Sequence, residues 1–125
     1  MMDFRFHSSD TPERGLWCPS SAVAHAFKGY SVVCSGVFDT RSGVGDIVDG
    51  ECAIDFRTFS EFSAELIARY CATDQGILRS LTVGFIATSL VLIDRAGLPG
   101  PLVPGEGQQQ AWAALRDQHA RAMPV

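Results

Sequence analysis

The sequence predicts a mainly α-helical protein with a small N-terminal β-hairpin, built as one domain of 125 residues. Three observations lead to this prediction. Apolar residues recur every three or four positions over most of the chain, which is the period of an amphipathic helix. Residues 3–7 instead alternate polar and aromatic side chains, as a half-buried strand does. A segment rich in Pro and Gly separates the last helix from the rest.

The N-terminal elements follow from this alternation. Residues 3–7 form the first predicted strand, SSDTPERG supplies a turn, and residues 16–18 return as the second strand. Ser20 or Ser21 then caps a helix, because its side-chain oxygen can accept from an orphan backbone N–H. We place the buried stripe of this helix at Val23, Phe27, Tyr30, Cys34 and Val37. His25 lies off the stripe and is expected to be exposed.

The middle of the chain is predicted to hold a loop and two helices. Residues 39–50 contain turn formers and glycines and are interpreted as a loop. Asp55 is expected to cap the next helix, and Thr58 with Glu61 is an alternative capping box three residues later. The apolar face of this helix comprises Phe56, Phe59, Phe62, Leu66, Ile67 and Tyr70. Residues 77–93 form the following helix. Because that helix is apolar on nearly every side, either its own domain or a second copy must surround it.

The last part of the chain divides into a linker and a helical arm. We expect residues 1–97 to hold the hairpin and the helical core, residues 98–107 to form the Pro/Gly-rich linker, and residues 108–125 to form the arm. An isolated helix of this length is marginal in water, so the arm needs a groove in which to dock. That groove is either on its own protomer or on a second copy. Because the arm is tethered and carries Trp112 as an anchor, we expect a homodimer that can exchange this helix.

Composition and charge argue against several classes of function. The formal net charge is −4 and the basic residues are not clustered, so we expect no nucleic-acid partner. The longest nearly apolar run is residues 81–93, whereas a membrane span needs about 20 residues, so we expect no membrane partner. The N-terminus does not resemble a signal peptide, and a cytoplasmic location is expected. The four Cys are far apart in sequence, so we predict reduced thiols, no metal site and no cofactor.

The stretch GVGDIVDGECAIDFRTF, residues 43–59, is the strongest candidate for chemistry because carboxylates are dense in it. It fails as a calcium loop, since Ile47 and Val48 stand at ligand positions. It also lacks the phosphate-binding loop of a phosphoryl-transfer enzyme. A carboxylate pair for glycoside hydrolysis, a Ser-His-Asp site and a Cys-His site remain open, although no local signature supports them.

The same acidic stretch has a structural interpretation and a functional one. In the structural interpretation, Asp55 caps a helix, the aspartates beside glycine form turns, and Glu51 is solvated. In the functional interpretation, Glu51, Asp49 and Arg57 line a groove beside Trp17.

Three segments, LWCPSSAVAHAF, GVGDIVDGECAIDFRTF and LTVGFIATSLVLIDRAG, resemble in order and spacing a family of small bacterial proteins of unassigned function. The size and layout also resemble the small proteins that form lysinoalanine in cinnamycin- and duramycin-type lanthipeptides. That second resemblance implies a helical fold with a short hairpin, a helix-swapped dimer, no cofactor and a peptide substrate.

Lysinoalanine forms by aza-Michael addition of a neutral lysine amine to the β-carbon of dehydroalanine. With an ordinary pKa near 10.4, only about one lysine in a few thousand is neutral at pH 7. A catalyst must therefore desolvate the amine and position both ends of the peptide, and positioning alone contributes up to about 7–11 kcal/mol. We hypothesise that Glu51 or Asp49 binds the ammonium of the substrate lysine. Arg57 would hold a substrate carboxylate or the developing enolate. Substrate binding is assigned to Trp17, Asp55 and Trp112. The alternative is a non-catalytic binding or immunity-type protein for a peptide or a small apolar molecule.

Overall fold

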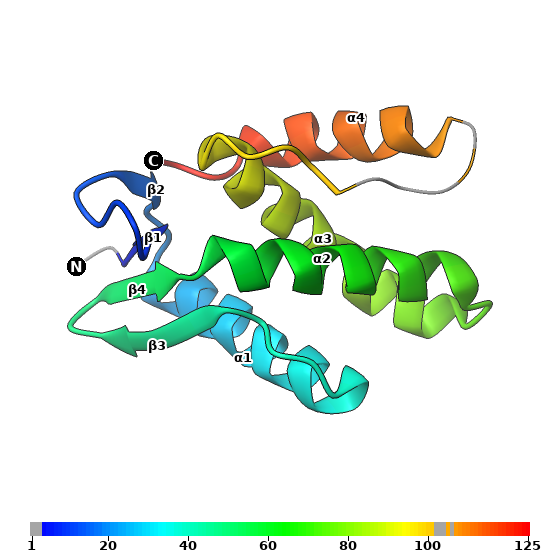
Figure 1. Ribbon diagram of the computed structural model, residues 1–125, viewed down its shortest axis with the longest axis horizontal. Helices are drawn as coiled ribbons and strands as arrows, with labels where there is room; N and C mark the ends of the chain where they lie inside the picture. Colours follow the sequence, from blue (N-terminus) through cyan, green and yellow to red (C-terminus); the bar gives the residue numbers. More distant parts are fainter. Residues whose placement is uncertain (1–3, 102–104, 106) are drawn as a thin grey trace.

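The structure is a computed structural model and describes residues 4–101, 105 and 107–125. The elements, in chain order, are β1 (Arg5–Ser8), β2 (Gly15–Trp17), α1 (Ser21–Phe38), β3 (Val44–Val48), β4 (Glu51–Ile54), α2 (Phe56–Ala72), α3 (Gly76–Arg95) and α4 (Gln108–Ala120). Figure 1 shows a small sheet at one end of a set of helices. The mainly α fold class with a small β part is confirmed. Residues 102–104 and 106 of the predicted linker lie outside the described residues.

The sheet is larger than the predicted hairpin, because residues 44–48 are a strand and not a loop. The strand order is β2-β1-β4-β3, with β1 and β4 parallel and both outer pairs antiparallel. Asp49 and Gly50 join β3 to β4 with φ values of 51° and 76°, the two positive φ angles of a type I′ hairpin turn. An Asp-Gly pair between two short strand-like runs is a hairpin signal, and the prediction of a loop did not use it.

The buried face of α1 differs in part from the predicted stripe. Its buried residues are Ala24, Phe27, Ser31 and Cys34, whereas Val23 and Val37 are exposed. The small Ala24 and Ser31 side chains let this face pack closely, and the Ser31 hydroxyl is satisfied because it donates to the Lys28 carbonyl at 2.6 Å. The prediction did not consider small residues, so it assigned Val23 and Val37 to the buried face in place of Ala24 and Ser31.

Helix α2 follows the prediction, and α3 is surrounded by its own chain over only half its length. The predicted α2 face is buried except for Tyr70, which is half-buried. By length and composition α3 is apolar enough to cross a membrane, but half of that stretch is buried inside the fold. Its second half is surrounded, while Ile77, Leu78 and Leu81 in its first half are exposed. The N-terminal end of α3 is therefore not covered by its own chain, and its coverage by a second copy stays a prediction.

An aromatic cluster joins the sheet to the helices at the centre of the core. The ring centroid of Phe27 lies 5.5 Å from that of Phe6, 5.4 Å from that of Trp17 and 4.9 Å from that of Phe85. Phe6 belongs to β1 and Phe85 to α3, so one side chain of α1 links three layers. Full burial of such rings is a main source of folding free energy.

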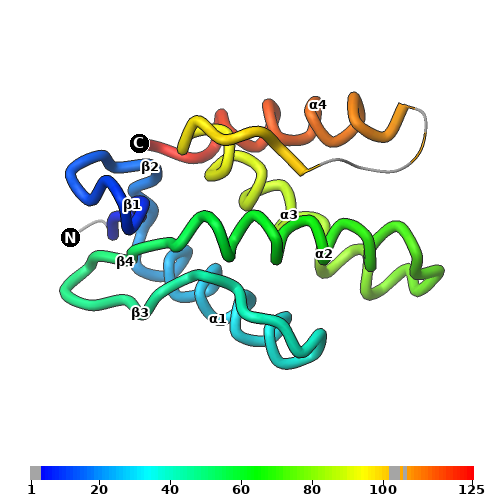
Figure 2. The backbone as a smooth tube through the Cα atoms, viewed as in Figure 1, coloured from blue at the N-terminus to red at the C-terminus, as the bar shows by residue number. Residues whose placement is uncertain are grey.

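The C-terminal arm docks against its own chain. Helix α4 packs against α3 and lies beside the C-terminal part of α3 in Figure 2, and Trp112 is buried with its ring centroid 5.2 Å from that of Tyr70. The guanidinium of Arg95 donates to the carbonyls of Leu16, Ala120 and Met123 at 2.9, 3.2 and 2.7 Å. One side chain thus ties the end of α3 to β2 and to the C-terminal segment. Exchange of α4 between two copies stays a prediction.

Candidate functional site

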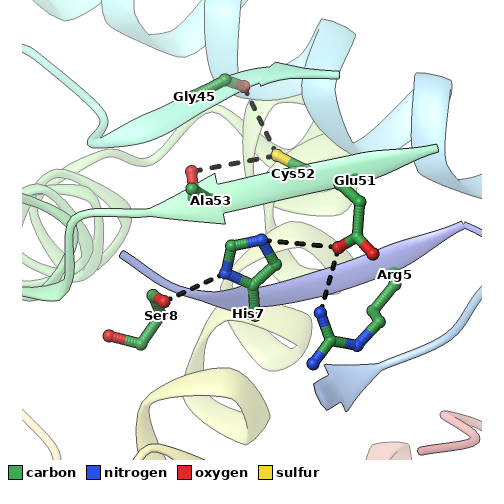
Figure 3. A network of polar contacts seen from close by, with 7 residues as sticks. All are labelled: Arg5, His7, Ser8, Gly45, Glu51, Cys52 and Ala53. Atoms are coloured by element: carbon green, nitrogen blue, oxygen red, sulfur yellow. Dashed lines mark hydrogen bonds and ion pairs between the residues drawn. The ribbon is translucent and has the colours of Figure 1, made fainter. Parts of the chain in front are cut away.

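The predicted carboxylate Glu51 belongs to a polar network on the outer face of the sheet (Figure 3). Glu51 Oε2 accepts from Arg5 Nη1 at 3.1 Å and lies 3.4 Å from His7 Nε2. His7 Nδ1 lies 3.0 Å from the Ser8 carbonyl oxygen. Arg5 and His7 were not predicted as site residues. Their alternation with Phe4 and Phe6 was the available signal, since alternate strand residues share a face.

The contacts of this network join β1 to β4. The Glu51 side chain is 47% exposed, and exposed ion pairs contribute at most about 1 kcal/mol. The His7 side chain is mostly buried, and both of its ring nitrogens already face oxygens. A substrate ammonium at Glu51 would have to compete with Arg5, which argues for a structural role of the network.

The predicted site residues are not gathered into one groove. In the strand register Glu51 pairs with Arg5, and Trp17 pairs with Phe6. Neighbouring residues of a strand point to opposite faces, so Glu51 and Trp17 lie on opposite sides of the sheet. Asp49 is in the turn before β4, while Arg57 follows the other end of this four-residue strand, about 13 Å long. Trp112 is distant again, on α4.

Asp55 is the N-cap of α2, as predicted. Its carboxylate accepts from the backbone N–H of Arg57 at 3.2 Å and from the Thr58 hydroxyl at 3.2 Å. We expect Asp55→Ala to lower the free energy of unfolding by about 1 kcal/mol, because two donors at the helix start lose their acceptor. Urea unfolding followed by circular dichroism measures the change. Asp46→Ala, at a fully solvated side chain that only approaches Lys28, is the control and should change stability by less than about 0.5 kcal/mol. Equal losses in the two variants would contradict the capping role.

The thiols and possible metal ligands offer no second centre in the described part of the chain. No three His, Cys, Asp or Glu residues there are placed to hold a metal ion. Cys34 and Cys52 are buried, Cys18 is half-buried and Cys71 is exposed. Burial raises the pKa of the Cys52 thiol to about 11, which keeps it protonated and unreactive at neutral pH.

A groove between α1, α3 and the C-terminal end of α4 has the character of a binding site. Its volume is about 350 Å³. Aromatic and aliphatic side chains form most of its surface, among them Trp17, Phe27, Tyr30, Leu81, Phe85 and Met123. A larger hollow between the end of α1 and the side of α2 has charged walls, where Arg69 pairs with Glu65 at 2.8 Å. The apolar groove is therefore the better candidate, and of the predicted residues only Trp17 lines it.

The polar groups of the groove are few and partly satisfied. Thr82 donates to the Leu78 carbonyl at 2.6 Å, so in the 3.1 Å contact between the two hydroxyls Tyr30 is the donor. Burial raises the pKa of Tyr30, which keeps that proton in place. Thr88 donates to the Gly84 carbonyl at 2.9 Å and keeps its oxygen lone pairs as acceptors. His119 lines the groove from α4.

Gly84 sets the depth of the groove. A Cβ at this position would meet no atom within 4 Å, so the space in front of the helix backbone is open. Trp17, Phe85 and Met123 come from three separate parts of the chain, which is why no local motif predicted the groove.

Residues 2–125 match the sequence profile of a family described as a family of unknown function (DUF6086). The chain belongs to the DUF6086 family. Neither the curated proteins nor the solved structures give a match to this DUF6086 chain. The family description assigns no activity, so lysinoalanine formation stays a prediction that rests on resemblance alone.

Proposed function

We propose that this DUF6086 protein binds a small apolar molecule with one polar group in the groove between α1, α3 and α4. The observation that supports the proposal is the groove itself, a space of about 350 Å³ walled by Trp17, Phe27 and Phe85. Small-molecule sites typically have volumes of about 300–1,000 Å³, with apolar walls and a few polar groups that orient the ligand. The volume is at the lower end of that range.

The arrangement of polar groups supports the choice of ligand. His119 can donate or accept, and the Thr88 oxygen can accept. Neither belongs to a charged pair in the described part of the chain. The groove therefore suits a ligand whose body is apolar and whose single polar group reaches one of these two side chains. A charged ligand would lose its hydration without a partner charge.

The role of binding module is favoured over lysinoalanine formation by the same geometry. Glu51, Asp49 and Arg57 lie outside the groove, and the Glu51 carboxylate already accepts from Arg5. No observation beyond the resemblance favours the catalytic interpretation. Its residues keep their structural roles: a strand-to-strand contact for Glu51, a turn for Asp49 and a helix start for Arg57.

Dye binding tests the proposal, with a substitution that fills the groove and leaves α3 intact. We expect wild-type protein to bind the neutral dye N-phenyl-1-naphthylamine saturably, at one dye per chain. Gly84→Leu should weaken binding by at least about tenfold, which corresponds to roughly 1.4 kcal/mol, because leucine occupies the space of the ligand. A glycine replaced inside a helix gains up to about 1 kcal/mol of helix propensity, so unfolding does not explain the loss.

Gly36→Leu is the matched control. Gly36 is exposed in α1, has open space in front of it and does not line the groove. The dye affinity of this variant should stay within about twofold of the wild type, a difference below 0.5 kcal/mol. Unchanged binding by Gly84→Leu, or an equal loss in both variants, would remove the groove as the binding site.

A further inference from the structure

Helices α1 and α3 lie next to each other and run in opposite directions. Phe27 of α1 stacks on Phe85 of α3, and three residues later Tyr30 bonds to Thr82. Phe38, at the end of α1, shares a hollow with Leu78. The residue numbers of the contacts on α3 thus decrease as those on α1 increase, which shows that the two helices are antiparallel. In Figure 2 the end of α1 and the start of α3 lie toward the same side of the molecule.

An exposed apolar surface covers these two helices where they meet. Val33 and Val37 of α1 are 58% and 67% exposed, and Ile77 and Leu81 of α3 are 76% and 63% exposed. We call these four residues the two-helix face. They continue the helical stripes that line the groove, with Val23, Ala26 and Tyr30 on α1 and with Gly84 and Thr88 on α3, and Leu81 belongs to both surfaces. No position on either stripe carries a charged side chain.

We propose that two copies of this chain associate through the two-helix face to form a symmetric dimer. A two-fold axis brings the same patch of both copies together, so the patch must complement itself. A surface without charge meets this condition, because no like charges are brought together. Small residues at Ala26 and Gly84 allow the helices of the two copies to approach closely.

The size of the surface fits a dimer. Helices of 18 and 20 residues are about 27 and 30 Å long, and two of them side by side are about 20 Å wide. Their outer face is therefore on the order of 600 Å². A stable interface buries about 800 Å² from each partner, and the end of α4 adjoins this surface and adds to it.

The lack of charge favours a second copy over a membrane surface. Helices that lie on membranes carry Lys and Arg along the border of their apolar face. Lys28 instead turns toward the sheet and donates to the Val44 carbonyl at 2.9 Å, and Arg79 stacks on Tyr70. The proposed dimer uses side chains of α1 and α3, so it needs no exchange of α4. Because Ala26, Leu81 and Gly84 also line the groove, the dimer would close over it.

Two adjacent valines give a matched test. Val32 and Val33 are 55% and 58% exposed on the same helix, but only Val33 belongs to the two-helix face. Sedimentation equilibrium of the wild type should give twice the chain mass of 13.5 kDa. Val33→Glu should raise the dimer dissociation constant at least about tenfold, because the symmetry places two carboxylates in one apolar interface. Val32→Glu should leave the constant within about twofold of the wild type.

Three outcomes would overturn the dimer. The first is a monomeric wild type at about 100 µM, a concentration far above the dissociation constant of a standard-size interface. The second is an equal effect of the two glutamates. The third is a monomer that floats with neutral phosphatidylcholine vesicles unless it carries Val33→Glu, which would assign the face to lipid. Circular dichroism checks that both variants stay helical, as expected for a Val-to-Glu change at exposed helix positions. The dye assay on Val33→Glu shows whether the groove binds dye when the dimer is lost.

Discussion

Arg95→Met is expected to lower the free energy of unfolding by about 3 kcal/mol or more and to loosen the C-terminal segment. The guanidinium donates to three backbone carbonyls, those of Leu16, Ala120 and Met123. Hydrogen bonds that involve a charged group contribute about 1.5–3 kcal/mol each, and methionine leaves these carbonyls without their donor. Burial lowers the pKa of Arg95 from its ordinary value, while Asp94 opposes that shift, so the side chain stays charged at neutral pH.

Urea unfolding followed by circular dichroism measures the loss of stability in Arg95→Met. Two further variants show whether the loss comes from the hydrogen bonds of the guanidinium. Arg95→Lys should recover only part of the loss, because an ammonium lacks the planar fork that reaches several acceptors. Arg116→Met is the control, since Arg116 makes only surface ion pairs with Asp94 and Asp117 and should cost less than about 1 kcal/mol. Comparable losses for Arg95→Met and Arg116→Met would mean that Arg95 does not anchor the C-terminus.

Gly43→Ala is expected to be the other strongly destabilising change, by at least about 2 kcal/mol, because it combines a disfavoured backbone conformation with a clash. Gly43 has a φ of 81°, and its carbonyl accepts from the Asp55 N–H at 2.8 Å. A Cβ there would stand 2.6 Å from the Asp55 carbonyl oxygen and 2.8 Å from the Phe59 nitrogen. Both neighbours are backbone atoms of the first turn of α2, so the junction between β3 and α2 must move.

Gly97→Ala separates the two causes. Gly97 has nearly the same φ, 79°, but an added Cβ would meet no atom within 4 Å. Gly97→Ala should therefore lower the free energy of unfolding only through the disfavoured backbone conformation, by roughly 1–2 kcal/mol. The same urea experiment compares the two, and Gly43→Ala should be clearly the worse. If the two glycines proved equally replaceable, the close contact at Gly43 would not constrain the fold.

The helices could be predicted because their signals are local. The Asp55 cap and the apolar face from Phe56 to Ile67 lie within one stretch of sequence, and both were found. The parallel pairing of β1 with β4 joins residues more than 40 positions apart, so no local pattern shows it. On α1 the burial of Ala24 and Ser31 was missed, because packing against the rest of the fold decides which side of a helix faces inward.

The candidate site was harder to predict than the fold. Density of carboxylates drew attention to residues 43–59, yet the structure distributes them over a turn, a strand contact and a helix cap. The groove is made of ordinary core residues such as Phe27 and Phe85, whose spacing indicates only burial. Its shape depends on the distance between α1 and α3 and on where Arg95 holds the C-terminus. Neither property is encoded in a short motif.

The central claim is that an apolar ligand occupies the groove beside Trp17, and fluorescence tests it directly. The chain has two tryptophans, and the indole N–H of Trp112 is buried without a hydrogen-bond partner in the described structure, so Trp112→Phe removes no such bond. In that variant Trp17 is the only tryptophan donor. Titration with N-phenyl-1-naphthylamine should quench Trp17 emission saturably while dye emission rises, and adding Gly84→Leu should abolish both changes. Dye binding that saturates without any change in Trp17 emission would place the ligand elsewhere and contradict the claim.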